Sequence, residues 1–473
     1  MSSISALNSL LGSSDPIDLS EILQAATGAS TPGIDVTSAV NASVTAAEAP
    51  ETNWENQQST LQNQTSALTG LQTDATNLDD DMQSLNSLTG PLSATTVNSS
   101  NSSVVTGSAA PGSALGNNIV VVNSLATTAS YSSSAVSSSS TDLPTGETIT
   151  ITPSGGSATT ITTGAGVNTL SDLEHAINTA GLGVTATVIT DASGARLAIT
   201  SNTSGSAGSF AITSSGGSFG FTVGNTGANA SLTVNGISVS SSSNTVTGAL
   251  PGVTLNLQNA SPGTEVSLDV TPDTSQASAA INQFVSDYNT LIGAVNSQYS
   301  DTGSGQGVLA DDPTVENLQN TLLQALDYTA SPASGNSSTT VPNLSSLGIT
   351  MNTNGTLSID NGTLSSALQN NFSDVQNFFQ GSALNGFANS MDQQLTNFTS
   401  PADGAFTVEL QSISTENTSL QTDITNFQTN VITPLKTQLQ SEYSAAEIAL
   451  QQLPAEIKDV DAELGNNNSS SNG

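Results

Sequence analysis

Few residues in this 473-residue chain have the type and spacing that catalysis requires. Asp301-Thr302-Gly303-Ser304 spells the active-site motif of aspartic proteases. That chemistry needs two carboxylates that share a proton, and the sequence contains no second copy of the motif. We therefore interpret 301–304 as a polar loop between two helices.

The remaining groups that could bind a metal or move a proton lack suitable neighbours. His175 is the single histidine and falls in a short predicted helix, so we expect a surface or partly packed residue. Asp79-Asp80-Asp81 and Asp311-Asp312 lack the alternating ligands, central glycine and closing glutamate of a calcium loop. We interpret both runs as a solvated helix face or a helix N-terminus. The sequence thus predicts no catalytic residue, no cofactor, no metal site and no enzyme.

Charge and composition exclude further classes of function. The net charge is −35, and the cations are Arg196, Lys436 and Lys458, too few to bind phosphate backbones or anionic lipid surfaces. Without cysteine there are no disulfides. The first residues lack the cationic and apolar regions of a secretory signal peptide. We also find no segment of the roughly 20 apolar residues that a membrane span needs. If the protein is exported, we expect a route without a cleaved signal.

Two long stretches carry the heptad pattern of coiled coils. In 53–88, apolar residues recur every seven positions, with a second row three residues on. A similar pattern spans 408–453, and Thr433-Pro434 interrupts it by a kink or a new helix start. We expect the first set to pack against the second: Trp54, Leu61, Leu68, Leu71, Leu78 and Leu85 against Ile413, Leu420, Ile424, Phe427 and Val431.

Between these stretches the pattern changes to short β-prone runs and then returns to helices. A helix at 281–297 presents Phe284, Tyr288, Leu291 and Ile292 on one face. The predicted fold class is α+β multidomain: a helical coiled-coil leg bundle formed by both chain termini, with a β-rich two-part head inserted between them. The predicted domains are 1–50 (N-terminal extension and terminal leg helix), 51–92 (N-terminal leg), 93–273 (β-rich head, with a short helix at 168–180), 274–400 (returning helical domain, with a β-hairpin at 347–360) and 401–473 (C-terminal leg and tail).

The leg helices are lean in apolar residues. Ordering a residue costs about 1–2 kcal/mol of backbone entropy, while a buried leucine-sized side chain returns about 1.5–3 kcal/mol. Only two or three residues in seven are apolar, and glutamate–lysine pairs are missing. We therefore hypothesise that the terminal helices order fully only when copies assemble.

Several segments, in this order, resemble one known family. They are PGIDVTSAV (32–40), the long stretch NTLSDLEHAINTAG…GSAGSF (168–210), LTVNGISVSSSSNTVTGALPGVTLNLQNASPG (232–263), INQFVSDYNTLIGAVNS (281–297), GVLADD (307–312), LGITMNTNGTLSID (347–360) and the terminal stretch from LKTQLQSEY to KDVDAEL. Together they resemble the bacterial flagellar filament cap protein, the hook-associated protein 2 family.

The resemblance implies a homo-oligomeric ring at the distal tip of the extracellular filament. Such a ring promotes folding and insertion of exported flagellin and prevents its leakage. The implied partners are further copies of the chain, flagellin, the flagellar type III export apparatus and a cytoplasmic export chaperone. The family's chaperone contact maps onto the C-terminal helix, at Tyr443, Ala446, Leu450 and Leu453. The chain departs from the family pattern in an extension before Gly33 and in Pro434 and Pro454 within the terminal helix.

Other functions remain as alternatives at this stage. A flagellin or hook–filament junction protein also has helical ends around a β-rich insert. A surface adhesin that binds host or surface glycans through the head, and so contributes to cell adhesion, is a second alternative. Loss of the gene distinguishes a filament cap from a filament subunit. Cells without a cap leak flagellin, whereas cells without the filament subunit secrete none.

Overall fold

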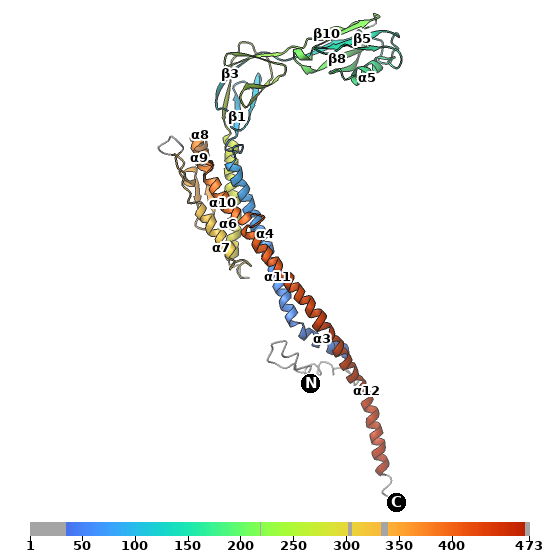
Figure 1. The fold of residues 1–473 in the computed structure, drawn as a ribbon, viewed down its shortest axis with the longest axis vertical. Coiled ribbons are helices and arrows are strands. Elements are labelled where there is room, and N and C mark those ends of the chain that lie inside the picture. Colours follow the sequence, from blue (N-terminus) through green and yellow to red (C-terminus); the bar gives the residue numbers. More distant parts are fainter. Residues whose placement is uncertain (1–34, 218, 301–304, 333–338, 469–473) are drawn as a thin grey trace.

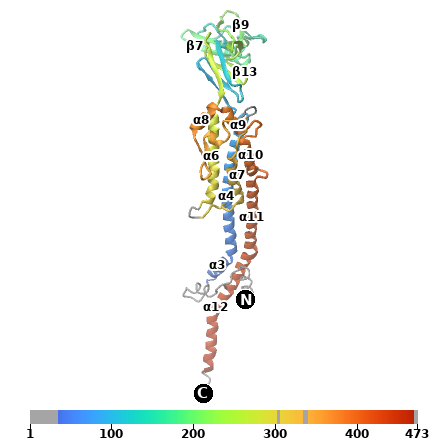
Figure 2. The same ribbon diagram turned by 90° about the vertical axis from the view of Figure 1, so that its left-hand side faces the viewer.

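The protein is elongated, with a helical leg and a head that bends away from it (Figures 1 and 2). The structure, a computed structural model, describes residues 35–217, 219–300, 305–332 and 339–468. The predicted extension before Gly33 and the loop 301–304 lie outside these ranges. Helices from both ends of the chain form the leg, and the strands lie in the head, apart from one short hairpin in the leg. The predicted fold class is confirmed.

The outgoing half of the leg consists of α3 (Val36–Ala47) and α4 (Ala49–Asn86). The Asp35 carboxylate caps α3 by accepting hydrogen bonds from the backbone N–H groups of Thr37 and Ser38, at 3.1 Å each. After α4 the chain turns tightly at Gly90, where an added Cβ would lie 2.1 Å from the Ser84 carbonyl oxygen. Only glycine permits this close approach.

The part of the head next to the leg, here called the inner head, contains two antiparallel sheets with a shared core of valine and leucine. Alternating residues of the strands point into this core, as expected for sheets with one buried face. The sheet orders are β1-β15-β3-β11-β12 and β13-β14-β2. The strands are β1 (Thr95–Ser99), β2 (Val105–Ala109), β3 (Gly116–Ser124), β11 (Ala230–Val234), β12 (Ile237–Ser241), β13 (Thr245–Leu250), β14 (Val253–Leu257) and β15 (Val266–Pro272).

The outer head is inserted in the inner head between β3 and β11. It has its own core, in which α5 covers sheets of order β10-β4-β8-β7 and β6-β5-β9. In Figure 1 it extends sideways from the inner head. Its elements are β4 (Thr128–Ser132), β5 (Thr148–Pro153), β6 (Thr159–Thr162), α5 (Leu170–Thr179), β7 (Val184–Asp191), β8 (Gly194–Ser204), η1 (Ser206–Gly208), β9 (Phe210–Ser215) and β10 (Thr222–Asn225).

The chain returns to the leg through α6 (Thr274–Tyr299), which packs along α4. The predicted apolar face of this helix is buried, with Phe284, Tyr288, Leu291 and Ile292 each at most 1% exposed. Smaller elements then flank α6 and α4. They are α7 (Pro313–Ala325), η2 (Leu344–Leu347), β16 (Ile349–Met351), β17 (Leu357–Ile359), α8 (Asn361–Asn370), α9 (Phe372–Gln380) and α10 (Phe387–Thr399).

The last part of the leg descends through α11 (Ala405–Phe427) and α12 (Thr433–Asn468). Between them the backbone makes a π-helical turn, Gln428–Ile432, and Pro434 is the second residue of α12. The Thr433 N–H donates to the Gln428 carbonyl across this wider turn. A proline in a helix interior removes one hydrogen bond and crowds the preceding turn, and a π-bulge relieves that crowding without ending the helix.

Candidate functional site

The groups with potential for catalysis lie far apart on different elements. His175 is exposed on α5 in the outer head. Asp312 caps α7 by accepting hydrogen bonds from the N–H groups of Thr314 and Val315, at 2.7 and 3.3 Å. The protease-like motif at 301–304 lies outside the described residues. Across the part of the chain that the structure describes, no group of three or more acidic or histidine side chains could hold a metal ion.

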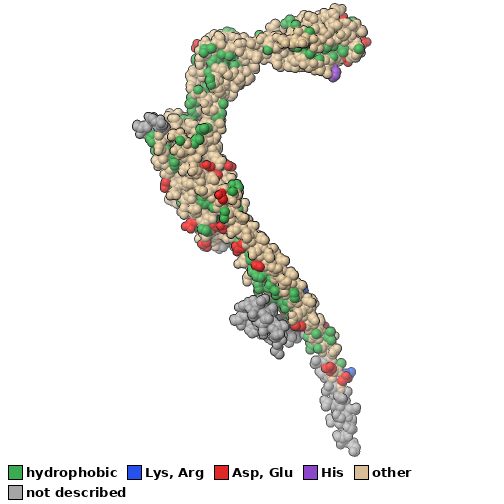
Figure 3. All heavy atoms as spheres, in the orientation of Figure 1, with side chains coloured by type: hydrophobic (Ala, Val, Ile, Leu, Met, Phe, Trp, Pro, Cys, Tyr) green, Lys and Arg blue, Asp and Glu red, His purple; other side chains and the backbone are tan. Residues whose placement is uncertain are grey.

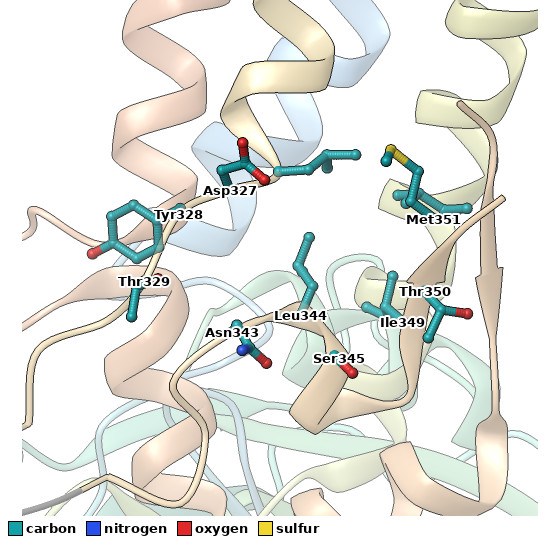
Figure 4. Close-up of a pocket in the computed structure, with 11 residues that line it drawn as sticks. Asp327, Tyr328, Thr329, Asn343, Leu344, Ser345, Ile349, Thr350 and Met351 are labelled. Atoms are coloured by element: carbon teal, nitrogen blue, oxygen red, sulfur yellow. The ribbon is translucent and has the colours of Figure 1, made fainter. Parts of the chain in front are cut away.

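A cavity of about 400 Å³ lies beside the C-terminal end of α7 and the hairpin β16–β17 (Figure 4). Its centre is apolar, with Leu344, Ile349 and Met351 around it, and Asp327 lies at its margin. The Tyr328 hydroxyl points away from the cavity and donates to the Asn385 carbonyl at 3.1 Å. The other polar lining includes the hydroxyls of Thr329, Ser345 and Thr350, and among the described residues no histidine or lysine that could activate one of them lines the cavity.

The lower leg brings together residues that are nearly 400 positions apart in sequence. Trp54 of α4 meets Phe427 edge to face, with ring centroids 5.5 Å apart. The Gln428 side-chain amide donates to the Glu51 carboxylate, and that of Gln58 donates to the Asn417 carbonyl at 3.3 Å. These contacts show that α4 and the α11 segment run antiparallel. The predicted residues Leu61, Ile413, Leu420 and Ile424 are between 7 and 9% exposed at this level.

Higher in the leg the partners of α4 change. Leu71, Leu78 and Leu85 are at most 2% exposed, in one core with α6 and α10. Leu68, also predicted, is fully buried in the same core. We expected all of these residues to pack against the helix that contains Ile413 to Val431. That helix, α11, begins at Ala405 and lies beside α4 as far as Thr69. Nearer the head, α4 meets earlier residues instead, with Asp79 beside Thr399 and Leu85 beside Gln380. The heptad pattern identifies a buried stripe, but the identity of the covering helix depends on where the return helices begin and end.

The foot of the leg is a separate small core. Val40, Val44 and Ala47 of α3 pack with Phe427 and Ile432, and Val431, Leu435, Leu439 and Tyr443 are partly buried beside them. The prediction for 1–50 was an N-terminal extension and terminal leg helix, and it did not include Val40, Val44 or Ala47 as packing residues. A signal was present, because Val36, Val40, Val44 and Ala47 follow the spacing of one helix face directly after the capping residue Asp35.

Beyond Tyr443, α12 continues without a described neighbour. Tyr443 is half-buried, Ala446 is exposed and Leu450 is 39% exposed. Ile448 is 57% exposed, and the side chain of Leu453 lies outside the described residues. Among the residues that the structure describes, no helix is long and apolar enough to span a bilayer. Ile448 and Leu450 are thus large apolar side chains of α12 that face solvent in the described chain.

One expectation about the acidic residues is wrong. Asp80 is exposed, but Asp79 is only 6% exposed and Asp81 is half-buried. Successive residues turn by about 100° around an α-helix, so three adjacent residues cannot all face solvent on a helix that is packed on several sides. Figure 3 shows acidic side chains along the helical part of the molecule, on a surface that is otherwise mostly polar and uncharged.

Asparagine side chains connect separate elements of this chain through paired hydrogen bonds. Asn289 of α6 accepts from the Leu357 N–H at 2.6 Å and donates to the Leu357 carbonyl at 2.8 Å. Asn244 forms the same double contact with Ala126, at 2.7 and 3.0 Å. Each amide satisfies both backbone groups of one residue, as a neighbouring strand would. Such contacts hold the hairpin on α6 and the loops of the inner head without any cation.

The comparisons with known proteins agree with this architecture. The family described as "Flagellar hook-associated protein 2 N-terminus" matches residues 32–129, and "Flagellar hook-associated protein 2 C-terminus" matches residues 227–455. The B-type flagellar hook-associated protein 2 of Pseudomonas aeruginosa is 29% identical over 338 residues, which cover 65% of this chain and 70% of that protein. The A-type protein of Pseudomonas aeruginosa is 30% identical over 164 residues, 33% of each chain.

A solved structure has the same arrangement of parts. The D1-D2-D3 domains of the flagellar cap protein FliD from Escherichia coli superpose with a TM-score of 0.58 at 27% identity, covering 74% of this chain and 99% of that one. The matched segments include the leg and both flanks of the head insertion. The chain therefore belongs to the flagellar hook-associated protein 2 family, the structural proteins that cap the distal tip of the extracellular flagellar filament.

Proposed function

We propose that copies of this chain assemble through their lower legs into a ring, which caps the filament and promotes the folding and insertion of flagellin beneath it. The observation that carries the proposal is the incomplete cover of the lower leg. There α4 and α11 pack mainly on each other, whereas higher up α4 is also covered by α6 and α10. A groove of about 590 Å³ runs between the two helices, lined by Leu61, Leu410 and Ile413.

The composition of the lower leg supports a second copy as the occupant of that groove. The groove is also lined by Thr65, Thr69 and Asn417, so an approaching helix meets apolar and neutral polar groups. A partner with many lysines is not required. Because the chain carries a net charge of −35, copies repel one another at low ionic strength. Salt shortens the range of this repulsion, so assembly should strengthen as salt is raised.

Electron microscopy of the purified full-length chain tests the ring directly. We expect closed rings or stacked rings at micromolar concentration in about 0.15 M salt, and fewer of them at low salt. In cells, deletion of the gene should release unpolymerised flagellin into the medium. A chain that stays monomeric at all concentrations and salts would contradict assembly through the leg, and a deletion strain with full-length filaments would contradict the capping role.

The exposed apolar residues of α12 support a second contact, with an export chaperone in the cytoplasm. Ala446 and Leu450 lie about one and two helical turns beyond Tyr443, which is partly buried beside the cluster at the foot of the leg. Leu453 continues this spacing in the sequence. A pull-down from cells should recover one chaperone with the wild-type chain and lose it with Leu450→Asp. The variant Ala449→Asp, on a neighbouring exposed position, should retain it.

Contact of the head with glycans is a second candidate function. The outer face of the sheet β6-β5-β9 presents hydroxyl groups in register, with Thr150 opposite Thr160 and Thr213, and Thr148 opposite Thr162 and Ser215. Hydroxyl arrays of this kind can exchange hydrogen bonds with sugars. Binding of the full-length chain to a glycan array, and its loss in Thr150→Val, would support this function. The family consists of structural cap proteins, which supports a role without enzymatic activity.

A further inference from the structure

Two pairs of carboxyl groups lie between the helices of the upper leg. Asp79 of α4 faces Asp392 of α10, and Asp81 of α4 faces Asp287 of α6. Because Asp79 and Asp81 are two residues apart, they point to nearly opposite sides of α4. The two pairs therefore occupy the two largest helix–helix contacts of α4, those with α10 and α6.

In each pair, one buried oxygen of the α4 carboxyl has no hydrogen-bond donor. Asp79 Oδ2 accepts from Thr399 Oγ1 at 3.2 Å and from Gln83 Nε2 at 3.4 Å, but no donor reaches the buried atoms Asp79 Oδ1 and Asp81 Oδ2. A buried acceptor without a partner is costly. A proton held between the two carboxyls of a pair would supply the missing donor.

No cation lies in this part of the leg to neutralise the pairs. Arg196 lies in β8 and His175 in α5, both in the outer head, and Lys436 and Lys458 lie in α12. Two further carboxyls on α4 add negative charge: Asp80 acts on both Asp79 and Asp81, and Asp74 acts on Asp287. Other elements that pack against α4 carry further carboxyl groups, none of which acts on Asp79 or Asp81: Glu48 next to α3, Asp374 in α9, and Glu409, Glu416 and Asp423 in α11.

We propose that each pair holds one shared proton, so that the contacts of α4 with α10 and α6 tighten in mildly acidic surroundings and loosen as the medium passes neutrality. The leg of this cap protein would then respond to the pH of its surroundings through two positions on one helix. The inference concerns the stability of the single chain and does not depend on the proposed ring.

The electrostatics of the site agree with the geometry. Burial, followed by the facing Asp392 carboxyl, raises the pKa of Asp79 from 3.8 to about 7. Burial, followed by Asp287, raises the pKa of Asp81 to about 7 as well. Since both pKa values are higher in the folded chain than in the unfolded chain, the protonated pairs stabilise the fold fully below about pH 4. This stabilisation is lost as the pH rises from about 4 through about 7.

Urea unfolding of the full-length chain between pH 5 and pH 8, followed by helical circular dichroism, tests the proposal. We expect the unfolding equilibrium constant of the leg to increase at least about tenfold between pH 5 and pH 8. The ideal limit is about tenfold per pH unit for each titrating carboxyl, and the expected change is smaller because solvent screens half-buried charges. The double variant Asp79→Asn/Asp81→Asn imitates protonated carboxyls and should remove most of the dependence, unfolding no more readily than wild type at pH 8. Asp423→Asn, an exposed position on α11, should keep it.

Side-chain carboxyl NMR on aspartate-labelled protein provides a readout that does not need the variants. Two carboxyl resonances should titrate near neutral pH. Aspartates that all titrate below about pH 5, or a double variant that retains the wild-type pH dependence, would overturn the proposal. Millimolar Ca²⁺ that stabilises the leg at pH 8 as strongly as acid does would also overturn it, since the pairs would then be a cation site.

Discussion

Replacing Leu71 and Leu78 with aspartate tests whether the upper leg depends on the buried stripe of α4. Both leucines are nearly or fully buried, at 2% and 0% exposure, in the core shared by α4, α6 and α10. Losing each leucine side chain removes about 1.5–3 kcal/mol of transfer free energy. Each new carboxyl must also be buried without a partner, which costs several kcal/mol or requires protonation.

The expected destabilisation is therefore about 4 kcal/mol or more per site and about 8 kcal/mol for both. This is comparable with the whole unfolding free energy of a typical domain, about 5–15 kcal/mol. We expect the leg to be unfolded at 25 °C in the double variant. The inner and outer heads have cores of their own, so they should stay folded and should survive limited proteolysis as a fragment near residues 93–273.

Circular dichroism and proteolysis measure the two halves of this prediction. In the described part of the head, α5 is the one α-helix, so loss of the leg removes most of the helical signal and leaves that of the strands. The control Thr73→Asp/Thr76→Asp places the same charges on exposed positions of α4, where both hydroxyls bond only to carbonyls of their own helix. Helicity that is unchanged in the leucine variant, or lost equally in the control, would refute the reasoning.

Two further substitutions test contacts at other levels of the leg. Asn289→Ala removes both hydrogen bonds to the backbone of Leu357 and should cost about 2–4 kcal/mol in urea unfolding. Thr290→Ala, whose hydroxyl bonds only within α6, should cost less than about 1 kcal/mol, and equal costs would contradict the role of the double contact. Phe427→Ala exposes the single tryptophan, Trp54, and should shift its fluorescence emission to longer wavelength. An unchanged spectrum would show that this aromatic contact does not order the lower leg.

The sequence predicted the parts of the fold that depend on local periodicity. Heptads identified α4 and α11, and the apolar face of 281–297 identified α6. The hairpin predicted at 347–360 is present as β16–β17, with Gly355 in its turn at a φ of +81°. These features arise from residues within one or two turns of each other. They can therefore be recognised in a single sequence before any tertiary contact is known.

Other features depend on contacts between distant segments and were not predicted. The position of the outer head between β3 and β11 follows from strand pairing, for example that of Leu232 with Val122 across more than 100 residues. The change of neighbour along α4, from α11 near Thr69 to α10 near Asp79, depends on the loop before Ala405. The burial of Asp79 depends on α10. Composition and period do not specify such neighbours.

Because the cores are separate, the packing of the leg helices can change while the packing of the head sheets stays the same. The leg, the inner head and the outer head each bury their own apolar side chains, and the chain passes between leg and head only near residues 93 and 273. A change in leg packing, through assembly at the groove beside Leu61 or through protonation of Asp79, therefore need not disturb the sheets. It can still alter the orientation of the head, because both crossing segments, through β1 and β15, belong to one sheet and must move together.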